Sequence, residues 1–332
     1  MALLLQPPGV DMLCNQAFSR DFSLPGAPFV AILMCAHNGA EFFARQFDSF
    51  EQLVYRHWSL HVSDDCSEDG THEVLQAYAE RWGARRLRVV GGPRAGLARN
   101  FLSLTCRADI EADYFTWSDQ DDIWSAEKLQ VAVDWLRGIP AEVPAVYCGR
   151  TQIIGEAETP LGVSANFSLP PHFKNPLVQS IGGGNAMVFN RAAWALIAQA
   201  GAELKVPSHD WWCYQLITGA GGVVHYDPQP HVFYRQRDGS VIGANSDWCA
   251  RLRRLAVVLQ GRFYEWSAQN IRALESLSHR LSTDHHKTLK LFKAARKRRL
   301  PGRVACILKA GLHRQTLLGN LGLALATLLK KI

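Results

Sequence analysis

Strand and helix signals alternate along the first half of the chain, and this alternation restricts the possible folds more than any other feature of the sequence. Segments typical of buried strands are followed by segments with apolar residues at helical spacing. A repeated strand–helix order predicts an α/β fold with a mostly parallel sheet and helices on both faces. The strand-like segments are residues 29–34, 59–63, 87–90, 114–118 and 145–150.

The chain divides at both ends of this α/β region. Residues 1–27 show no clear period and contain Pro-Pro and Pro-Gly pairs, so we expect a loose N-terminal arm. Two further strand signals lie at 223–226 and 232–234, after which the pattern becomes helical. We therefore expect an α/β domain at 28–245 and a helical, basic C-terminal region at 246–332.

The formal charge of +6 conceals an uneven distribution of charge. Residues 285–332 contain 12 Lys and Arg and no Asp or Glu, which leaves 24 basic and 30 acidic residues in 1–284. A basic tail on a mildly acidic body indicates contact with an anionic surface, either a membrane or a nucleic acid.

Apolar residues accompany the charges of the tail. Leu289, Leu291 and Phe292 lie in its most basic stretch, and residues 316–329 are apolar but too short to span a bilayer. Because basic amphipathic helices lie on anionic bilayers, we predict that the tail is a peripheral membrane anchor. The alternative is a helical pair that packs on the α/β domain or on a second subunit, as in a homodimer.

The cysteines and the first residues indicate a cytoplasmic location. None of the eight cysteines forms a Cys-x-x-Cys pair, and their spacing suggests a reducing compartment rather than a zinc site or a disulfide framework. The first residues lack a basic leader, and Pro7-Pro8 interrupts the apolar run, so we expect no signal peptide.

Polar clusters follow three of the predicted strands. His37-Asn38-Gly39, Asp64-Asp65 and Asp119-Gln120-Asp121-Asp122 come after the first, second and fourth strands. In open α/β sheets, ligands bind outside the carboxyl ends of the strands. We therefore expect these clusters to line one crevice.

The acidic cluster at 119–122 gives the strongest single signal. Three carboxylates within four residues repel one another unless a cation compensates them. Mg²⁺ and Mn²⁺ accept hard oxygen ligands and can bridge a diphosphate, so the cluster predicts a divalent metal site. The alternative is a solvated acidic loop that caps a helix.

Two neighbouring clusters suggest a nucleotide. Asp64 and Asp65 can accept a hydrogen bond from a base or a ribose hydroxyl, although Ser67 and Asp69 in the same segment are good helix caps. Arg94 lies in a Gly-rich loop and could reach a phosphate or base, or could simply face solvent. This loop matches neither the dinucleotide fingerprint nor the P-loop. Its sequence therefore argues against a nicotinamide-dependent dehydrogenase and against a P-loop phosphotransferase.

Later residues suggest a general base and a sugar-binding wall. Asp210, which follows His209 at a predicted helix start, can act as a base or only as an N-cap. Gly184, before Asn185, permits a ligand to approach the backbone closely, or marks a simple turn. Trp211 belongs to the core or to an apolar wall against a sugar.

Taken together, these motifs resemble family 2 glycosyltransferases of the GT-A fold, with a likeness to the bacterial rhamnosyltransferase branch. The resemblance runs from about Phe29 to Ala244 and implies a Rossmann-like GT-A domain at 28–245. Its landmarks are Ala36-His37-Asn38-Gly39, Ser63-Asp64-Asp65-Cys66-Ser67, Gly96, Asn100-Phe101, Trp117 to Trp124 with Lys128, Gly183 to Met187, His209-Asp210-Trp211-Trp212 and Tyr234-Arg235-Gln236.

The resemblance implies roles for individual residues. Asp210 would deprotonate the acceptor hydroxyl in a direct displacement that inverts the anomeric centre. Asp121 and Asp119 would hold Mg²⁺ or Mn²⁺, and Asp119 would also serve the ribose. The nucleotide pocket would comprise Ala36, His37, Asn38, Asp64, Asp65, Arg94 and Asp119. The sugar or acceptor contacts would be Gly184, Asn185, His209, Trp211, Arg235 and Arg237.

Two departures from the family pattern affect these roles. Ala36 replaces the usual Thr or Ser, and Arg237 replaces a histidine that would be a third metal ligand. Arginine has no lone pair to offer a metal but binds phosphate oxygens well, so we expect Arg237 to take over part of the metal's work at the diphosphate. The alternatives are a solvent-facing Arg237, and His231 as a substitute ligand.

The resemblance also implies partners. We expect a nucleotide-sugar donor, first dTDP-rhamnose and next UDP-sugars, and a glycan or lipid-linked glycan acceptor in cell-surface polysaccharide or lipopolysaccharide synthesis. The enzyme would work in the cytoplasm at the inner face of the bacterial cell membrane. The alternatives are a non-catalytic nucleotide-sugar-binding relative, and a nucleic-acid-binding protein that acts through its basic tail.

Overall fold

Strand β1 (Val30–Ala36) is buried along its whole length and lies inside the parallel part of the sheet. The structure is a computed structural model that describes residues 26–236 and 261–332. β1 pairs in parallel with β2 (Trp58–Asp64) and β4 (Tyr114–Ser118), and β2 pairs in parallel with β3 (Leu87–Gly91). Continuous apolar burial of this kind is typical of a strand covered on both faces.

The other half of the sheet is mixed, in contrast to the parallel half that the strand–helix repeat predicts. The strand order is β3-β2-β1-β4-β8-β6-β9-β5, and β7 pairs with β6. β8 pairs antiparallel with β4 and β6, β5 with β9, and β7 with β6, whereas β6 and β9 are parallel. The additional strands are β5 (Ile123–Trp124), β6 (Ala145–Ile154), β7 (Pro160–Val163), β8 (Val188–Asn190) and β9 (Val223–Arg235).

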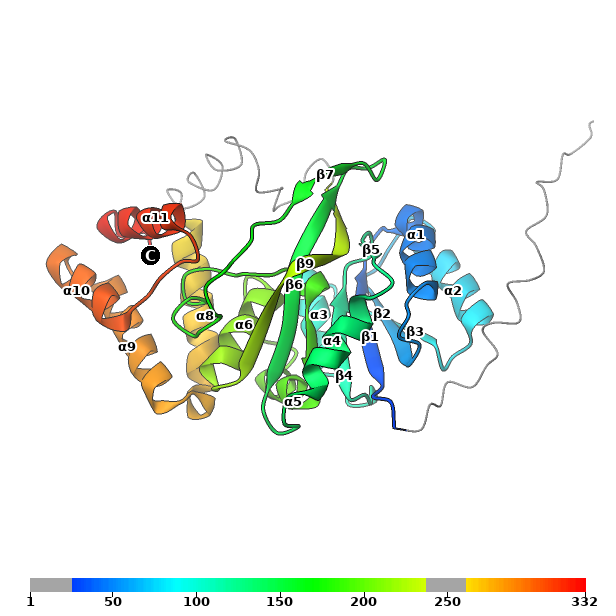
Figure 1. Cartoon of the computed structure of the whole chain (residues 1–332), viewed down its shortest axis with the longest axis horizontal. Helices are drawn as coiled ribbons and strands as arrows, with labels where there is room; N and C mark the ends of the chain where they lie inside the picture. Colours follow the sequence, from blue (N-terminus) through cyan, green and yellow to red (C-terminus); the bar gives the residue numbers. More distant parts are fainter. Residues whose placement is uncertain (1–25, 237–260) are drawn as a thin grey trace, which may run out of the picture.

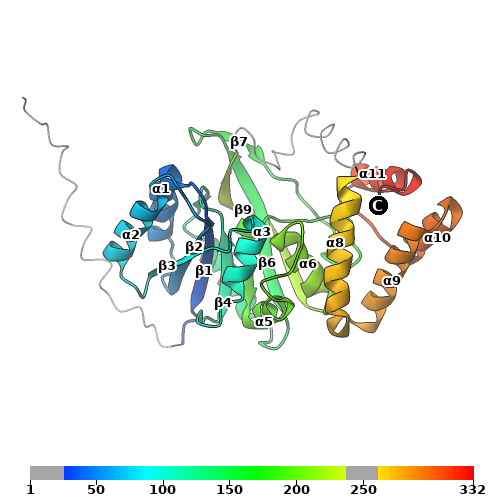
Figure 2. The same ribbon diagram turned by 180° about the vertical axis from the view of Figure 1, so that it is seen from behind.

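Alternate residues of β1 point into two cores on opposite faces of the sheet. Ala31, Leu33 and Cys35 pack with α3 (Leu97–Thr105), α5 (Arg191–Ala200) and α6 (His209–Gly219). The intervening residues pack with α1 (Ala40–Glu51), α2 (Thr71–Trp82) and α4 (Lys128–Arg137). Figure 1 shows α4 in front of the sheet, and the reverse view in Figure 2 shows α3 and α5. The expected α/β class with helices on both faces is therefore confirmed.

Two local expectations differ from the structure. The predicted strands at 223–226 and 232–234 are two parts of β9, because a register shift opposite Arg150 accommodates Pro228 and Pro230 without breaking the pairing with β6. The sequence also favours Ser125 as the cap of the helix that follows the acidic cluster, but α4 begins at Lys128 after an N-cap at Glu127.

The C-terminal helices continue the core of the α/β domain. They are α8 (Arg262–Ser276), α9 (Thr283–Lys297), α10 (Leu300–Ala310) and α11 (Leu317–Leu328). Leu289 and Phe292 of α9 are each 1% exposed and belong to the same core as α6. The prediction that these two residues contact lipid is therefore wrong, and the alternative of packing on the α/β domain holds for α9. Within the described residues, no helix is long and apolar enough to cross a bilayer.

Candidate active site

The carboxyl ends of β1, β2, β3 and β4 lie next to one another at one edge of the sheet. The register pairs Ala36 with Asp64, and Asp64 with Gly91, so the following loops leave the sheet at the same level. β4 ends at Ser118 beside Met34, and the acidic loop follows directly. The structure therefore brings together the polar clusters that the sequence predicts at this edge.

The Gln120 amide joins the acidic loop to the loop after β1. Its Oε1 accepts from the His37 backbone N–H at 2.7 Å, and its Nε2 donates to the His37 carbonyl at 2.9 Å. A Cβ at Gly39 would lie 2.5 Å from the Gln120 side chain, so only glycine permits this approach. The sequence analysis did not predict this role of Gln120. The only sign of it in the sequence is that an amide side chain stands between the carboxylates of the acidic cluster.

Asn38 connects the loop after β1 to the loop after β2. It adopts a positive φ of 48°, which asparagine tolerates better than most residues. Its backbone N–H donates to Ser67 Oγ at 2.9 Å, and its Oδ1 accepts from the Glu68 N–H at 2.8 Å. His37 and Asn38 are both exposed, as a nucleotide contact requires.

Asp64 and Asp65 have different surroundings. Asp64 Oδ1 accepts from the hydroxyl and N–H of Ser67, so this carboxylate shapes its own loop. Asp65 Oδ1 accepts from the Arg94 N–H at 2.5 Å, which places Arg94 at the same edge. Ala36 is 1% exposed, and its carbonyl accepts from the Asp65 N–H at 2.8 Å. Ala36 thus supports the loop through its backbone, while its side chain belongs to the core.

The three carboxylates of the acidic loop are not equivalent. Asp122 is 1% exposed, and its Oδ2 accepts from Asn185 Nδ2 at 2.6 Å. Burial raises the pKa of Asp122 well above its ordinary value, and the charges of Asp119 and Asp121 raise this pKa further. Asp122 is therefore a structural residue, which leaves Asp119 and Asp121 as the candidate ligands.

Lys128 lies buried close to the acidic loop. Its Nζ donates to Thr116 Oγ1 at 3.2 Å and lies 3.2 Å from the centre of the Trp124 ring. Burial lowers the pKa of Lys128 well below its ordinary value, against the attraction of Asp122 and Asp119. Burial therefore disfavours the charged form of Lys128, and the two carboxylates only partly offset this effect.

Asp119 and Asp121 fit a hard divalent cation by the chemistry of their oxygens. Within residues 26–236 and 261–332, no group of three His, Cys, Asp or Glu side chains could hold a metal ion. His231 is an unsuitable substitute ligand, because its Nδ1 bonds Ser125 Oγ at 3.1 Å and its Nε2 faces Asp227. Arg237 lies outside the described residues. A metal here would therefore rest on two carboxylates and on oxygens of the ligand.

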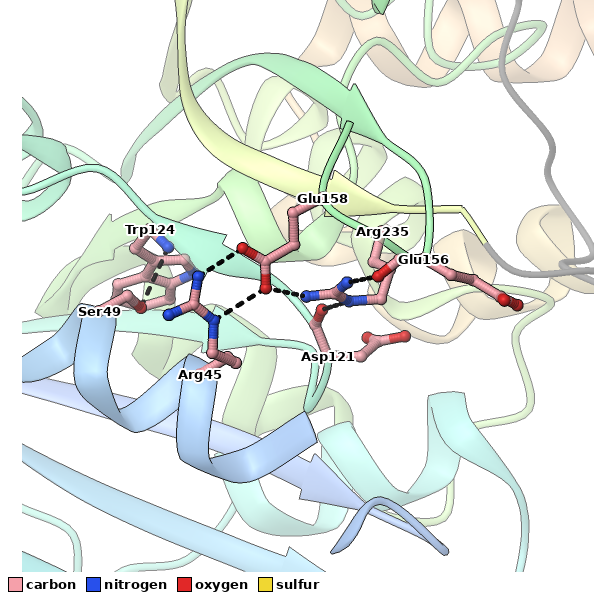
Figure 3. Close-up of polar contacts among 7 residues, drawn as sticks. All are labelled: Arg45, Ser49, Asp121, Trp124, Glu156, Glu158 and Arg235. Carbon is pink, nitrogen blue, oxygen red and sulfur yellow. Dashed lines mark hydrogen bonds and ion pairs between the residues drawn. The ribbon is translucent and has the colours of Figure 1, made fainter. Parts of the chain in front are cut away.

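Arg235, at the end of β9, holds the backbone of the acidic loop. Its guanidinium is 4% exposed; Nε donates to the Asp121 carbonyl at 3.2 Å and another nitrogen donates to the Glu156 carbonyl at 2.6 Å. Glu158, in the turn between β6 and β7, accepts from Arg235 at 3.3 Å and from Arg45 Nε at 2.8 Å (Figure 3). Arg235 therefore positions Asp121 and does not have the predicted role of a sugar contact.

The Glu158 carboxylate is held in its ionised form by these two arginines. The hydrogen bonds from Arg45, and then those from Arg235, lower the pKa of Glu158 to about 2. Glu158 joins α1, the β6–β7 turn and β9 at the position shown in Figure 3. Sequence reasoning missed both Glu158 and Arg45, because no motif marks them.

Asp210 lies at the first turn of α6, close to the 3-10 helix η2 (Gly184–Ala186). Its Oδ1 accepts from the Trp211 N–H at 2.6 Å and its Oδ2 accepts from the Gly184 N–H at 3.2 Å. Burial raises the pKa of Asp210 to about 6, although these backbone hydrogen bonds oppose the shift. A carboxylate with this pKa is suited to accept a proton near neutral pH.

His209 and Trp211 form the support of Asp210 rather than a ligand surface. The His209 ring is 6% exposed, stacks on Phe101 at 4.0 Å, and is neutral because burial lowers its pKa to about 3. A Cβ at Gly184 would collide with His209 Nε2. Trp211 is 7% exposed and donates from its indole to the Pro176 carbonyl at 2.6 Å. Both predicted sugar contacts are therefore packed in the interior.

We expect Gly92→Ala to weaken binding of the expected nucleotide-sugar about tenfold, equivalent to about 1.4 kcal/mol. The added Cβ would lie 2.7 Å from Asp65 Oδ1 and 2.9 Å from Asp65 Cα, so the loop that carries Asp65 must move. Gly91→Ala is the matched control, because a Cβ there meets no atom within 4 Å. Calorimetric titration checks this prediction, and equal affinities of the two variants would contradict it.

We expect Glu158→Gln to raise the KM for the nucleotide-sugar several-fold and to lower the free energy of unfolding by about 1–3 kcal/mol, because the buried Arg235 loses its charged partner. Glu156→Gln is the control, since Glu156 contributes only its carbonyl and its side chain is exposed. Steady-state kinetics and urea unfolding provide the two measurements. An unchanged donor KM in Glu158→Gln would show that this contact does not position the acidic loop.

Comparisons with known proteins agree with this geometry. Residues 31–196, half of the chain, match the family described as Glycosyl transferase family 2. The chain is 25% identical over 239 residues to the dTDP-rhamnosyl transferase RfbG of Shigella flexneri, over 68% of this chain and 78% of that protein. It is 27% identical over 112 residues to the putative teichuronic acid biosynthesis glycosyltransferase TuaG of Bacillus subtilis, over 33% of this chain and 42% of that protein.

A solved structure shares the fold. The crystal structure of S. aureus TarS 1-349 in complex with UDP-GlcNAc aligns with a TM-score of 0.50 and 12% identity, over 86% of this chain and 93% of that chain. The family match covers the parallel strands and the acidic loop that form the site. The chain therefore belongs to glycosyl transferase family 2.

Proposed function

We propose that the chain transfers a sugar, with rhamnose from dTDP-rhamnose as the first candidate, to a hydroxyl of a glycan or lipid-linked glycan. The reaction inverts the anomeric centre and belongs to bacterial cell-surface polysaccharide synthesis. The observation that carries this proposal is Asp210, a carboxylate whose pKa is raised to about 6. The names of RfbG and TuaG support the rhamnosyl donor and the polysaccharide, respectively.

Asp210 takes the proton of the acceptor hydroxyl as that oxygen attacks the sugar. The N–H groups of Gly184 and Trp211 fix the orientation of the carboxylate, and the neutral His209 behind it adds no competing positive charge. The buried position raises the affinity of the carboxylate for a proton, which makes it a stronger base than an exposed aspartate.

The donor nucleotide binds in the loops after β1, β2 and β3. Asp65 accepts from the base, and the exposed His37, Asn38 and Arg94 complete the pocket. Asp121 and Asp119 would hold Mg²⁺ or Mn²⁺, which when bound neutralises charge on the diphosphate. Arg235 and Gln120 keep the acidic loop in place for this binding.

Asp210→Asn should reduce kcat by about 10²–10⁴-fold, because the amide cannot accept the proton, while donor affinity stays unchanged. In the wild type, the acid limb of the kcat/KM profile should have an apparent pKa of about 6, because the reactive form is the ionised carboxylate. The pKa of Asp210 is higher in the folded protein than in the unfolded chain. Ionisation of Asp210 therefore lowers the free energy of unfolding as the pH rises from about 4 to about 6.

Asp210→Asn should therefore unfold at the same or a higher temperature than the wild type at pH 7.5. Stopped-assay kinetics from pH 5 to 9 and thermal unfolding measure the two effects. Near-normal turnover of the variant would remove Asp210 from the role of base.

A panel of nucleotide-sugars tests the donor and the metal together. Thermal unfolding with dTDP-rhamnose, UDP-sugars and GDP-sugars, each with and without Mn²⁺, should give the largest stabilisation for dTDP-rhamnose with Mn²⁺. Asp121→Ala should lose the increment due to Mn²⁺, whereas Glu127→Ala, an exposed acidic residue nearby, should keep it. Stabilisation by none of the donors would refute the function, and a surviving Mn²⁺ effect in Asp121→Ala would place the metal elsewhere.

The enzyme works at an anionic membrane, at the inner face of the cell membrane. The charge of residues 285–332 supports this part of the proposal, because that segment has 12 basic and no acidic residues. A lipid-linked acceptor would be presented at the same surface. Negatively charged lipids attract basic segments by about 1 kcal/mol per Lys or Arg near the surface.

A further inference from the structure

Helix α11 exposes a row of leucines to solvent. Leu317 is 78% exposed, Leu318 65%, Leu321 59%, Leu325 42% and Leu328 53%. At 100° per residue these five positions lie on one side of the helix. Scattered exposed leucines are ordinary on a protein surface, but a contiguous apolar face usually marks an interaction site. We call these five residues the leucine face.

The opposite side of α11 is fixed to the protein. Leu323 and Ala326 are buried in the main core, and Arg303 of α10 donates to the Thr327 carbonyl at 2.8 Å. Gln315, just before the helix, exchanges two hydrogen bonds of 3.0 Å with the backbone of Leu169. The leucine face is therefore presented by a docked helix that uses its other side for packing.

The charges that flank α11 along the chain are all positive, and Glu265 of α8 lines a pocket together with Lys330 and Lys331. α11 contains no charged residue; Arg314 precedes it and Lys330 and Lys331 follow it. No acidic residue occurs after Asp284. An apolar face between cations matches an anionic lipid surface, where leucines enter the acyl boundary and the long basic side chains reach the headgroups. A nucleic acid would match the cations but not the leucines.

The position of α11 also suits a membrane-bound reaction. Figures 1 and 2 place α11 at the same level of the molecule as β7 and α1, on the side where the carboxyl end of β1 carries the site. The Gln315 contacts tie α11 to the segment around Leu169, which precedes η2 of the site in the chain.

We propose that the leucine face of α11 is the surface by which this enzyme enters the interface of an anionic bilayer, with Lys330 and Lys331 on the headgroups. This inference rests on the proposed membrane location and names the element responsible. It replaces α9, whose leucine and phenylalanine face the core, as the lipid contact. The contact holds the active-site edge near lipid-linked acceptors.

Flotation of the full-length protein with vesicles tests the inference. The vesicles are phosphatidylcholine alone, or phosphatidylcholine with phosphatidylglycerol. The test variant is Leu317→Gln/Leu321→Gln/Leu325→Gln, and the control is Val54→Gln/Leu161→Gln/Val163→Gln, which removes three exposed apolar residues from the α/β domain. The wild type and the control should float with the anionic vesicles, and the test variant should lose at least about tenfold in partition coefficient.

A charge variant separates the two contributions. Lys330→Gln/Lys331→Gln should weaken binding to anionic vesicles and should leave any weak binding to neutral vesicles unchanged, because it removes only the electrostatic attraction. The stabilisation of each variant by nucleotide-sugars should match that of the wild type. If no protein, including the wild type, binds a nucleotide-sugar, that result contradicts the proposed function. It does not bear on the lipid contact of the leucine face.

Two outcomes would overturn the inference. Equal flotation of the test variant and the wild type would show that the leucine face does not contact lipid. A wild type that sediments as a dimer and does not float, together with a monomeric test variant, would show that the face binds a second copy of the chain.

Discussion

The hydrogen bond from Asn185 Nδ2 to the buried Asp122 Oδ2 connects the two halves of the site. Asp122 belongs to the acidic loop, and Asn185 follows Gly184, whose N–H contacts Asp210. The acidic loop and Asp210 are therefore joined through the segment Gly184-Asn185. Asp122 is buried where it makes this connection. It is therefore a structural residue, and not a candidate metal ligand, despite its place in the acidic cluster.

The backbone of the acidic loop is restrained from two other directions. Gln120 holds it against the loop after β1, and Arg235 holds it from the end of β9. Preorganised groups need not reorder when charge develops in the transition state, and this is a major source of catalytic power. Glu158 and Arg45 extend the same restraint to the first helix of the fold.

The sequence predicted well what depends on local patterns. Buried strands such as β1 are recognisable by continuous apolar runs, and the polar residues that follow β1, β2 and β4 lie at one edge of the sheet. Asp122 could not be distinguished from Asp119 and Asp121, because its hydrogen bond from Asn185 and its exposure of only 1%, rather than its residue type, set it apart. Arg235 and Asp121 are 114 residues apart, and Gln315 and Leu169 are 146 apart, so no local pattern could reveal these contacts. The prediction that Leu289 and Phe292 contact lipid was wrong for the same reason, because their contacts with the main core are not local in the sequence.

The contact between Gly184 and His209 makes the size of one residue depend on that of the other. The imidazole is confined by Phe101 and Trp117 and so has no room to move away from a larger side chain at 184. A related enzyme with a side chain at that position would therefore need a smaller residue in place of His209. The two positions should vary together during evolution, and neither should drift alone.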